Sequence, residues 1–330
     1  MATVSGSGRL IYMKIVVLDG YALNPGDLAW AEFEALGELI VYDRTSPEDV
    51  LERSQGCDVL ITNKATVSRE TIQATETLKY IGVLATGVNI VDVDAATERG
   101  IPVCNVTGYG PGSVAQMVFA HILNFTHRLA EQAADAQGGG WAKSPDFCYW
   151  IQPLVELKDQ TLGIVGLGQI GQATARIGQG FGMNVVAYTR DQSREVRDGV
   201  SWASLDELFS ESDFISLHCP LTPETENMIN EARIIQMKSS AILINTGRGQ
   251  LVDEHALAHG LNQGQIAGAG LDVLTSEPPN QDNPLLRAKN CVVTPHIAWA
   301  TQAARNRLMQ MAAENLKAFQ RGEVQNCVNL

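Results

Sequence analysis

The chain has 330 residues, of which 45% are hydrophobic, and a formal net charge of -13. This length favours two domains with sizeable cores. The acidic balance without a basic block argues against binding to nucleic acid or to an anionic membrane. The 6 cysteines include no C-x-x-C pair, so we expect free thiols in a reducing, cytoplasmic compartment and no metal site. No apolar run reaches the roughly 18 residues of a membrane-spanning helix, so no membrane partner is expected.

The first region, residues 13–110, alternates short apolar runs with helical patterns. This alternation predicts a parallel sheet with helices on its faces, in a flavodoxin-like layout. Residues 1–12 are too short and too polar for a secretory signal, and we leave them out of the predicted fold as a leader. The predicted strands are 15–18, 38–42, 59–62, 80–84 and 102–106, and the predicted helices include 26–36, 68–74 and 92–99.

Glycine and proline at 110–112 mark a hinge before the second region. Ser113 is placed to cap a long helix over residues 114–134. The segment after it, up to residue 153, is irregular and rich in aromatic residues. Such a segment either packs within the fold or forms a lip over a pocket.

Three glycines at the spacing G-x-G-x-x-G follow an apolar run at 161–165. They are Gly166, Gly168 and Gly171, and a helical segment and a second apolar run at 184–188 come next. In this strand–turn–helix–strand context the motif predicts a dinucleotide site. The glycines allow a tight turn, close approach of a pyrophosphate and close packing of the helix, whose N-terminus favours an anion.

The end of the second strand departs from the common NAD-selective pattern, in which an acid about 20 residues on holds the ribose 2′-hydroxyl. Thr189 stands at the position of that acid, and Arg190 follows it. Without the carboxylate a 2′-phosphate is not repelled, and an arginine can pair with it. We therefore expect NAD(P)H as cofactor, with NADP(H) accepted and a preference for it left open. Alternatively, Arg190 is a solvated surface residue and Asp191 holds the ribose.

Further strands and helices alternate up to residue 294 and predict a second doubly wound sheet. A long helix from residue 298 to about 321 is expected to return to the first domain. The predicted fold class is therefore α/β, with two doubly wound parallel-sheet domains around a cleft. We assign residues 13–110 and 297–330 to a discontinuous substrate-binding domain and 111–296 to a Rossmann-type cofactor domain. A helix is also predicted over 226–237.

Four blocks of sequence carry a resemblance over essentially the whole chain from Met13. They are ATGVNIVD at 85–92, the glycine loop, INTGRG at 244–249 with LVD at 251–253, and GLDVLTSEPP at 270–279 with TPH at 294–296. The chain resembles the D-isomer-specific 2-hydroxyacid dehydrogenases. The segments at 146–154 and 297–301 are similar to the branch of glycerate dehydrogenases and hydroxypyruvate reductases.

The resemblance implies that Arg248, Glu277 and His296 are catalytic. Each follows a predicted strand, where ligands bind in open parallel sheets. Arg248 can hold a substrate carboxylate and polarise the keto oxygen, and His296 can give or take a proton near neutral pH. A carboxylate at Glu277 would orient the imidazole and favour its protonated form. Taken singly, the arginine and histidine could be surface groups and the glutamate a turn residue.

The resemblance also implies contacts to substrate and cofactor. The substrate, a small anionic 2-keto or 2-hydroxy acid, would meet Asn63, Lys64, Gly87, Val88, Arg248 and Trp299, although Lys64 could equally be a solvated lysine. Besides the glycines, Thr189 and Arg190, the cofactor would meet Gln169, Ile170, Pro220, Thr246 and Asp272, whose carboxylate would accept from the nicotinamide carboxamide. His218 is expected to form part of the cofactor wall.

The activity implied is hydride transfer between nicotinamide and C2 of the acid, by a glycerate dehydrogenase or hydroxypyruvate (glyoxylate) reductase. Other acids stay open as substrates, which would make the chain a D-lactate or phosphoglycerate dehydrogenase. A protein of another class, a dinucleotide-sensing corepressor, keeps the same fold in this family. The resemblance further implies a homodimer, formed through the helix at 114–134 and the aromatic segment.

Overall fold

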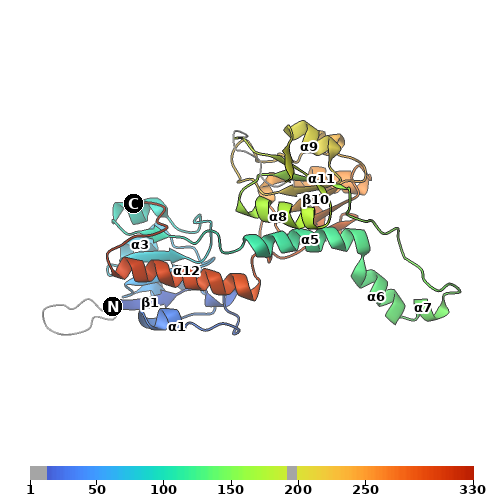
Figure 1. Cartoon of the computed structure of the whole chain (residues 1–330). Coiled ribbons are helices and arrows are strands. Elements are labelled where there is room, and N and C mark those ends of the chain that lie inside the picture. The colour runs from blue at the N-terminus through green and yellow to red at the C-terminus, as the bar shows by residue number, and fades with distance from the viewer. Residues whose placement is uncertain (1–12, 192–198) are drawn as a thin grey trace, which may run out of the picture. The chain divides into compact units, whose positions relative to one another are not determined.

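The computed structural model describes residues 13–191 and 199–330, so the predicted leader at 1–12 lies outside the described residues. The chain divides into two compact units. Unit 1 contains the described residues up to Gly110 together with Ala300–Leu330, and unit 2 is Pro111–Trp299. Both contain a parallel sheet flanked by helices (Figure 1). The predicted α/β class with two parallel sheets is therefore confirmed.

The five strands of unit 1 are ordered β2-β1-β3-β4-β5, and all pairs are parallel. This is the strand order of flavodoxin-like folds. The strands are β1 (Met13–Val17), β2 (Gly37–Val41), β3 (Val59–Thr62), β4 (Tyr80–Val83) and β5 (Val103–Cys104). The helices are η1 (Gly20–Ala22), α1 (Ala31–Glu34), α2 (Val50–Ser54), α3 (Arg69–Ala74), α4 (Val93–Glu98) and α12 (Gln302–Gln320).

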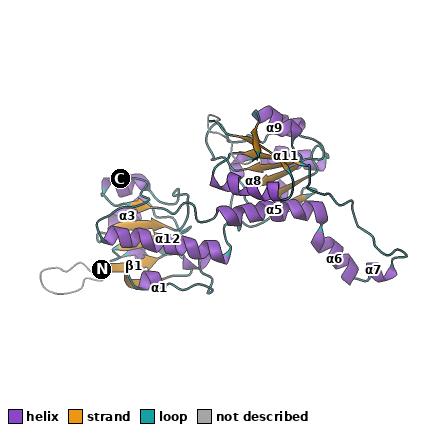
Figure 2. Ribbon diagram, viewed as in Figure 1, coloured by secondary structure: helices purple, strands orange, loops and turns teal. Residues whose placement is uncertain are grey.

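The core of unit 1 lies on both faces of this sheet. Every residue of β3 and β4 is buried, as expected for parallel strands covered on two sides. The C-terminal helix α12 covers one face (Figure 2), where the rings of Tyr80 and Phe319 lie 5.0 Å apart. Residues more than 200 positions apart in the sequence thus share one core.

The seven strands of unit 2 are ordered β12-β11-β10-β9-β6-β7-β8, and all pairs are parallel. The strands are β6 (Thr161–Val165), β7 (Asn184–Tyr188), β8 (Val200–Trp202), β9 (Phe214–Leu217), β10 (Ile242–Asn245), β11 (Gly268–Leu271) and β12 (Cys291–Val293). The helices are α5 (Pro111–His127), α6 (Leu129–Gln137), α7 (Gly140–Lys143), α8 (Gln169–Gly180), α9 (Leu205–Glu211), α10 (Glu231–Gln236), η2 (Gly249–Leu251), α11 (Glu254–Asn262) and η3 (Pro284–Arg287).

The chain direction across this sheet reverses between β6 and β9. From β6 the chain moves outward through β7 and β8, then returns to β9 and continues to β12 on the other side. Ligands of doubly wound sheets bind beyond the carboxyl ends of the strands at such a switch point. The loop after β6 carries the three glycines, so the motif lies where the topology favours a ligand.

The helix predicted at 26–36 is wrong in its first half. The Asn24 side chain accepts hydrogen bonds from the N–H groups of Gly26 and Leu28, and it donates to the Leu28 carbonyl. Asp27 forms an ion pair with Arg305 of α12 at 2.6 Å. These bonds hold the segment in a turn, and α1 forms only over Ala31–Glu34.

The helix predicted at 114–134 is interrupted. It begins earlier, at Pro111, and ends at His127, because Arg128 adopts a left-handed conformation with a φ of 44°. Ser113 therefore lies inside α5 and does not cap it; its hydroxyl donates to the Ala298 carbonyl at 2.6 Å. The helix predicted at 226–237 is also shorter, since it starts only after its cap, Asn230.

None of the helices in residues 13–191 and 199–330 is both long enough and apolar enough to cross a membrane.

Candidate active site

The glycine loop joins β6 to the N-terminus of α8. Gly166 has a φ of +98°, and a Cβ there would lie 2.7 Å from the Cys219 backbone nitrogen. At Gly171 a Cβ would lie 2.2 Å from the Gly166 carbonyl oxygen, whereas at Gly168 it would meet no atom within 4 Å. The first turn of a helix has unpaired N–H groups. The open space at Gly168 therefore fits a pyrophosphate bound at this helix N-terminus.

The other predicted cofactor residues lie after neighbouring strands. Gln169 and Ile170 begin α8, Pro220 is exposed after β9, and Thr246 directly follows β10. The Thr246 hydroxyl is buried and has no hydrogen-bond partner among the described residues. Because buried polar groups are nearly always hydrogen-bonded, this unpartnered hydroxyl fits a bound polar ligand.

Thr189 and Arg190 follow β7, and Arg190 is exposed. The pKa of Glu224, in the loop after β9, is lowered mainly by a hydrogen bond from the Thr222 side chain. The positive charge of Arg190 lowers this pKa further and is the smallest cause. Arg190 thus lies near the loop after β9 that contains Pro220. Asp191, the other candidate for the ribose, is exposed as well.

His296 and Glu277 form a close pair. The Nδ1 atom of His296 lies 2.6 Å from Oε2 of Glu277, and the two side chains are 32% and 36% exposed. An ionised carboxylate can only accept, so Nδ1 carries a hydrogen and Nε2 is the atom left for proton transfer. The other oxygen of Glu277 accepts from the Leu274 N–H at 3.0 Å, which fixes the carboxylate.

The backbone of His296 is held in an unusual conformation. Its φ is 53°, in the left-handed region that β-carbon-bearing residues rarely adopt. Its N–H donates to the carbonyls of Asp272 and Thr294, both at 2.9 Å, and its own carbonyl accepts from Trp299 Nε1 at 3.0 Å. Residues kept in such conformations concentrate at functional sites. Through its hydrogen bond to the His296 carbonyl, Trp299, a predicted substrate contact, lies against the His296 backbone.

Asp272 is an anchor of the same loop, a role that we did not predict. Its carboxylate is buried and accepts from the Thr294 hydroxyl at 2.6 Å and from the N–H groups of Ile297 and Ala298 at 3.0 and 2.7 Å. These three bonds use most of its acceptor capacity within the protein. The contact between Asp272 and the carboxamide of the nicotinamide stays a prediction.

Arg248 lies on the same sheet edge as the His296–Glu277 pair. It follows β10, Glu277 follows β11 and His296 follows β12, and these three strands are neighbours. Its guanidinium is exposed and donates to the Gly247 carbonyl at 2.8 Å. No carboxylate of the described residues pairs with it. Arg248 is thus an exposed cation on the sheet edge that also carries the His296–Glu277 pair, and its guanidinium is available to an anion.

In unit 1, the predicted residues Asn63 and Lys64 follow β3. Their backbone N–H groups, and that of Ala65, donate to the carboxylate of Asp19, which follows β1. The Asn63 side chain is buried and donates to the Leu84 carbonyl at 3.0 Å, while the Lys64 side chain is exposed. Asn63 therefore joins two loops of the sheet edge, and only Lys64 presents its side chain to solvent.

Gly87 and Val88 lie in the loop after β4, on the same edge of unit 1. Thr86 on one side is fixed, since its hydroxyl donates to the Val106 carbonyl at 3.1 Å and its carbonyl accepts from Asn105 at 2.7 Å. No acceptor for the N–H groups of Gly87 and Val88 occurs among the residues that the structure describes. Two adjacent N–H groups of this kind suit a carboxylate.

His218 ends β9 beside the glycine loop. Its Nε2 atom lies 2.9 Å from the Ser216 hydroxyl and 3.3 Å from that of Thr174 at α8. Burial lowers the pKa of His218 to about 4. The ring is therefore neutral at physiological pH and suits a wall better than an acid.

This shifted pKa predicts how stability depends on pH. Between about pH 6.5 and pH 4 the unfolded chain binds a proton at His218 that the folded chain does not, so this residue lowers the unfolding free energy as the pH falls. In His218→Gln, urea unfolding should therefore show a smaller loss between pH 7 and pH 5, by at most about 2 kcal/mol. The exposed His255 provides the control: if His255→Gln changes the pH dependence equally, the assignment fails.

Within residues 13–191 and 199–330, no three His, Cys, Asp or Glu side chains gather in a way that could hold a metal ion.

The chain is similar to known proteins over the region that contains the glycine loop, Arg248, Glu277 and His296. Residues 119–298 match the family described as D-isomer specific 2-hydroxyacid dehydrogenase, NAD binding domain. The chain is 48% identical over 321 residues to a hydroxypyruvate reductase from Blautia hydrogenotrophica, covering 96% of this chain and 100% of the relative. It is 39% identical over 318 residues to a glycerate dehydrogenase from Methylorubrum extorquens, covering 96% and 98%.

A solved structure extends the likeness to the fold. An acyclic imino acid reductase in complex with NADPH and D-Arg has a TM-score of 0.82 and 32% identity, with 96% of this chain and 100% of that chain covered. The family match includes the glycine loop and all three strand ends that carry Arg248, Glu277 and His296. The chain therefore belongs to the D-isomer-specific 2-hydroxyacid dehydrogenases, a family of nicotinamide-dependent oxidoreductases.

Proposed function

We propose that this protein is a hydroxypyruvate and glyoxylate reductase, which forms D-glycerate or glycolate and also catalyses the reverse oxidation. The observation that carries the proposal is the His296–Glu277 pair at 2.6 Å, on the sheet edge that also holds Arg248. The relatives named hydroxypyruvate reductase and glycerate dehydrogenase support this choice of acid. We assign the cofactor site to unit 2 and propose that residues of each unit contribute contacts to the substrate.

His296 is the proposed proton donor. When a nicotinamide cofactor is bound, it supplies the hydride for C2 of the keto acid. The negative charge that develops on the keto oxygen is neutralised by a proton from Nε2 of His296, since Nδ1 is held by Glu277. Glu277 stabilises the protonated ring before this transfer. In the oxidation direction the same nitrogen accepts the hydroxyl proton.

Arg248 is the proposed anchor of the substrate. Its guanidinium can bind the carboxylate with two parallel hydrogen bonds and polarise the adjacent keto oxygen. From unit 1 we propose the N–H groups of Gly87 and Val88 as further carboxylate donors, and Lys64 as a cation that attracts the acid. Trp299, fixed to the His296 carbonyl, is proposed to shape the pocket. Asn63 positions its loop.

The substrate proposal is tested with purified protein and a panel of keto acids. Hydroxypyruvate and glyoxylate should give the highest kcat/KM, and pyruvate and phosphohydroxypyruvate should give much lower values. Oxidation of the nicotinamide is followed by its absorbance, with NADH and NADPH in parallel. The proposal would be contradicted if none of these acids is reduced with either cofactor. A clear preference for pyruvate or for phosphohydroxypyruvate would identify that acid as the substrate instead.

We propose that the cofactor is NADP(H) as well as NAD(H). Thr189 provides no carboxylate to repel a 2′-phosphate, and Arg190 lies exposed beside it. The imino acid reductase of similar fold was solved with NADPH. The alternative is that Asp191 selects NAD(H) by holding the ribose hydroxyls.

Arg190→Ala should weaken NADPH binding by about 10-fold or more, because a charge-assisted hydrogen bond contributes about 1.5–3 kcal/mol. NADH binding should change little, since NADH has no 2′-phosphate. Fluorescence titration of the two cofactors measures the difference. Equal losses for both cofactors would show that Arg190 does not contact the 2′-phosphate.

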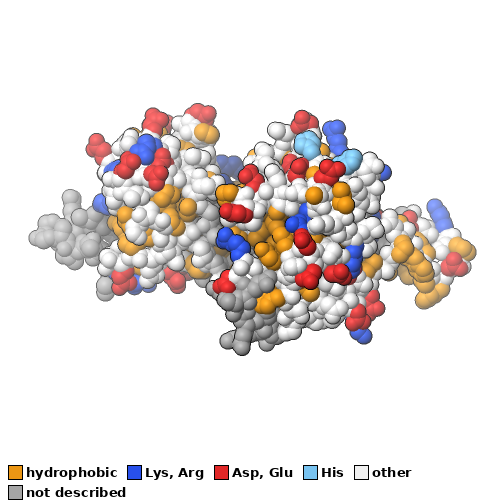
Figure 3. Space-filling model, turned by 90° about the horizontal axis from the view of Figure 1, so that it is seen from above, with side chains coloured by type: hydrophobic (Ala, Val, Ile, Leu, Met, Phe, Trp, Pro, Cys, Tyr) orange, Lys and Arg blue, Asp and Glu red, His pale blue; other side chains and the backbone are white. Residues whose placement is uncertain are grey.

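We propose a homodimer formed through the segment that leaves α5. Helix α6 has no buried residue, and three apolar side chains near it, Leu129, Phe147 and Trp150, are 76%, 91% and 60% exposed. Hydrophobic side chains gather on this projecting segment (Figure 3). Exposed apolar patches of this kind mark protein–protein contacts. A second copy of the chain is the partner that the family resemblance implies.

The dimer proposal predicts a mass of about twice 35.7 kDa by light scattering after gel filtration. Phe147→Asp should shift the protein toward the monomer, because burying a carboxylate in an apolar contact costs several kcal/mol. Asp146→Asn, a neighbouring exposed change, should leave the mass unaltered. A monomeric wild-type protein would contradict the proposal.

We also propose that the protein works in the cytoplasm. All 6 cysteines are free thiols, and Cys57 and Cys104 are buried. Cell fractionation with an antibody to the protein tests this location.

A further inference from the structure

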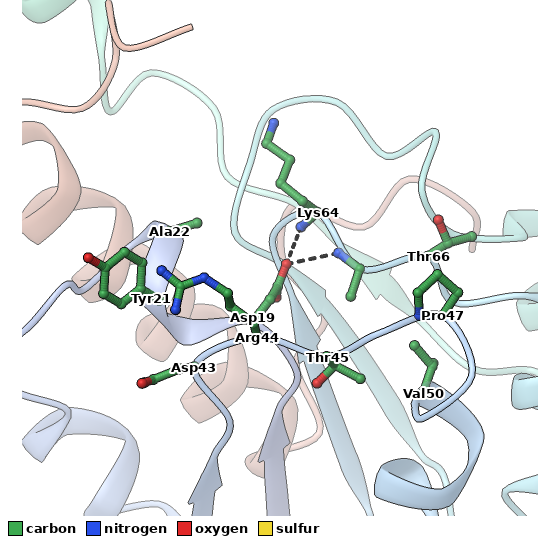
Figure 4. A pocket seen from close by; sticks show the side chains of 11 residues that line it. Asp19, Tyr21, Ala22, Asp43, Arg44, Thr45, Pro47, Val50, Lys64 and Thr66 are labelled. Atoms are coloured by element: carbon green, nitrogen blue, oxygen red, sulfur yellow. Dashed lines mark hydrogen bonds between the residues drawn. The ribbon is translucent and has the colours of Figure 1, made fainter. Parts of the chain in front are cut away.

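Unit 1 contains a cavity of about 330 Å³, and Lys64 is the one residue of its lining that has a proposed role in the reaction. The cavity lies beyond the carboxyl ends of β2, β1 and β3, three neighbouring strands. Figure 4 shows that its walls come from the loops after these strands: Tyr21, Arg44, Thr45, Lys64 and Thr66, with Asp19 between them. This volume is at the lower end of the roughly 300–1,000 Å³ of small-molecule pockets.

The topology of unit 1 favours a ligand at this place. From β1 the chain moves to β2 on one side, and from β3 it continues to β4 and β5 on the other side. The direction therefore reverses between β1 and β3, and ligands of doubly wound sheets bind beyond the strand ends at such a point. The cavity spans the ends of both strands. It is thus the counterpart, in this second sheet, of the glycine-loop position in unit 2.

The guanidinium of Arg44 is the group in the cavity that favours an anion. The guanidinium carbon of Arg44 lies 3.8 Å from the centroid of the Tyr21 ring. Although Asp43 also lines the cavity, no acidic group in the described part of the chain forms an ion pair with Arg44. An arginine stacked on an aromatic ring keeps its planar donor groups in one orientation, which suits a carboxylate or phosphate. Lys64 supplies a second positive charge to the lining.

Asp19 is bonded to its own unit's backbone and not to Arg44. Its carboxylate accepts from the N–H groups of Asn63, Lys64 and Ala65, and Figure 4 shows the carboxylate beside Lys64. Hydrogen bonds of this kind stabilise the charged form of a carboxylate, so Asp19 stays negative. The lining therefore contains the carboxylates of Asp19 and Asp43 as well as the cations of Arg44 and Lys64. Within it, Arg44 is the cation whose planar donor groups no carboxylate of the described residues occupies.

We propose that this cavity binds a small anion, a dicarboxylate or a phosphate group, through the guanidinium of Arg44. Arg248, the proposed anchor of the keto acid, does not line this cavity, so we propose the anion as a second ligand. Lys64, which has a proposed substrate role, also lines the cavity. An occupant there would contact the loop held by Asp19 and change how Lys64 meets the substrate.

The test is an isothermal calorimetric titration of the full chain with inorganic phosphate and, separately, with succinate, at constant ionic strength. Wild-type protein should bind one of the two with a stoichiometry of one per chain, which tells a phosphate site from a dicarboxylate site. Arg44→Met should weaken this binding at least about 10-fold, since it removes the guanidinium that donates paired hydrogen bonds to the anion. The matched control is Arg321→Met, which removes the same charge from an exposed position of unit 1 outside the cavity.

The variant Arg248→Gln tests whether the anion binds in the cavity or at the proposed substrate anchor. Binding should persist in this variant; if it is lost, the anion occupies the substrate site and the proposal is overturned. It is equally overturned if neither anion binds in the millimolar range, or if Arg321→Met weakens binding as much as Arg44→Met. Circular dichroism of each variant shows that it is folded. Failure of keto acid turnover would affect the proposed function and leave these binding results unchanged.

Discussion

Replacing His296 with glutamine should lower kcat for hydroxypyruvate by about 10²–10⁴-fold, the range expected when a general acid is removed. Glutamine can still donate a hydrogen bond from its amide, but it cannot release a proton at neutral pH. NADH and NADPH should bind as tightly as in the wild-type protein, because the glycine loop is untouched. Steady-state kinetics with hydroxypyruvate and fluorescence titration of the cofactors measure the two quantities separately.

His255→Gln is the matched control, since His255 is an exposed histidine on α11 and is not one of the residues proposed for the site. It should retain wild-type kcat. If His296→Gln keeps a kcat within a few-fold of wild type, another group supplies the proton and the proposed role of His296 is lost. If the variant loses cofactor binding as well, the left-handed backbone at His296 has been disturbed, and the kinetic result cannot be assigned to proton transfer.

The family resemblance implied the pairing of His296 with Glu277, and parallel strands allow it because they bring their carboxyl ends to one edge. Arg248, Glu277 and His296 each follow a strand, so residues up to 48 positions apart reach one sheet edge. The glycine loop could be predicted from its spacing, which encodes a backbone geometry. Patterns of this kind record which edge a residue occupies, and the roles of these residues stay predictions.

The elements predicted wrongly depend on partners that are distant in sequence. Residues 26–36 have a helical pattern, but Asp27 pairs with Arg305, nearly 280 positions later, and Asn24 closes the turn locally. Helix α6 has the composition of a continued α5, yet the chain turns at Arg128. Local sequence preference is weak compared with tertiary contacts, so neither break could be read from the sequence alone.

Two acidic residues, one in each unit, show what sequence reasoning missed. Asp19 and Asp272 each follow a buried strand, and each carboxylate accepts three hydrogen bonds that hold a functional loop. Asp272 had been assigned to the cofactor and Asp19 to nothing. An acid directly after a buried β-strand is a signal for such an anchor, because loop N–H groups there need acceptors. Each unit therefore uses a buried carboxylate to hold a loop at its sheet edge.

Arg248→Gln should reduce kcat/KM for hydroxypyruvate by about 10²–10⁴-fold. The substrate carboxylate would lose two charge-assisted hydrogen bonds, each contributing about 1.5–3 kcal/mol, and the keto oxygen would lose a polarising cation. Because the carboxylate is bound before and during the reaction, KM should rise, and the loss of polarisation should lower kcat as well. Arg248→Lys should recover only part of the loss, since an ammonium group cannot form the paired fork.

Arg287→Gln is the matched control in unit 2, because Arg287 is also exposed and follows no strand of the site edge. It should keep wild-type kcat and KM. Cofactor titration should give the same affinity in both variants, which separates loss of substrate binding from damage to the dinucleotide site. An unchanged KM in Arg248→Gln would mean that the carboxylate is held elsewhere. The N–H groups of Gly87 and Val88 would then be its main donors.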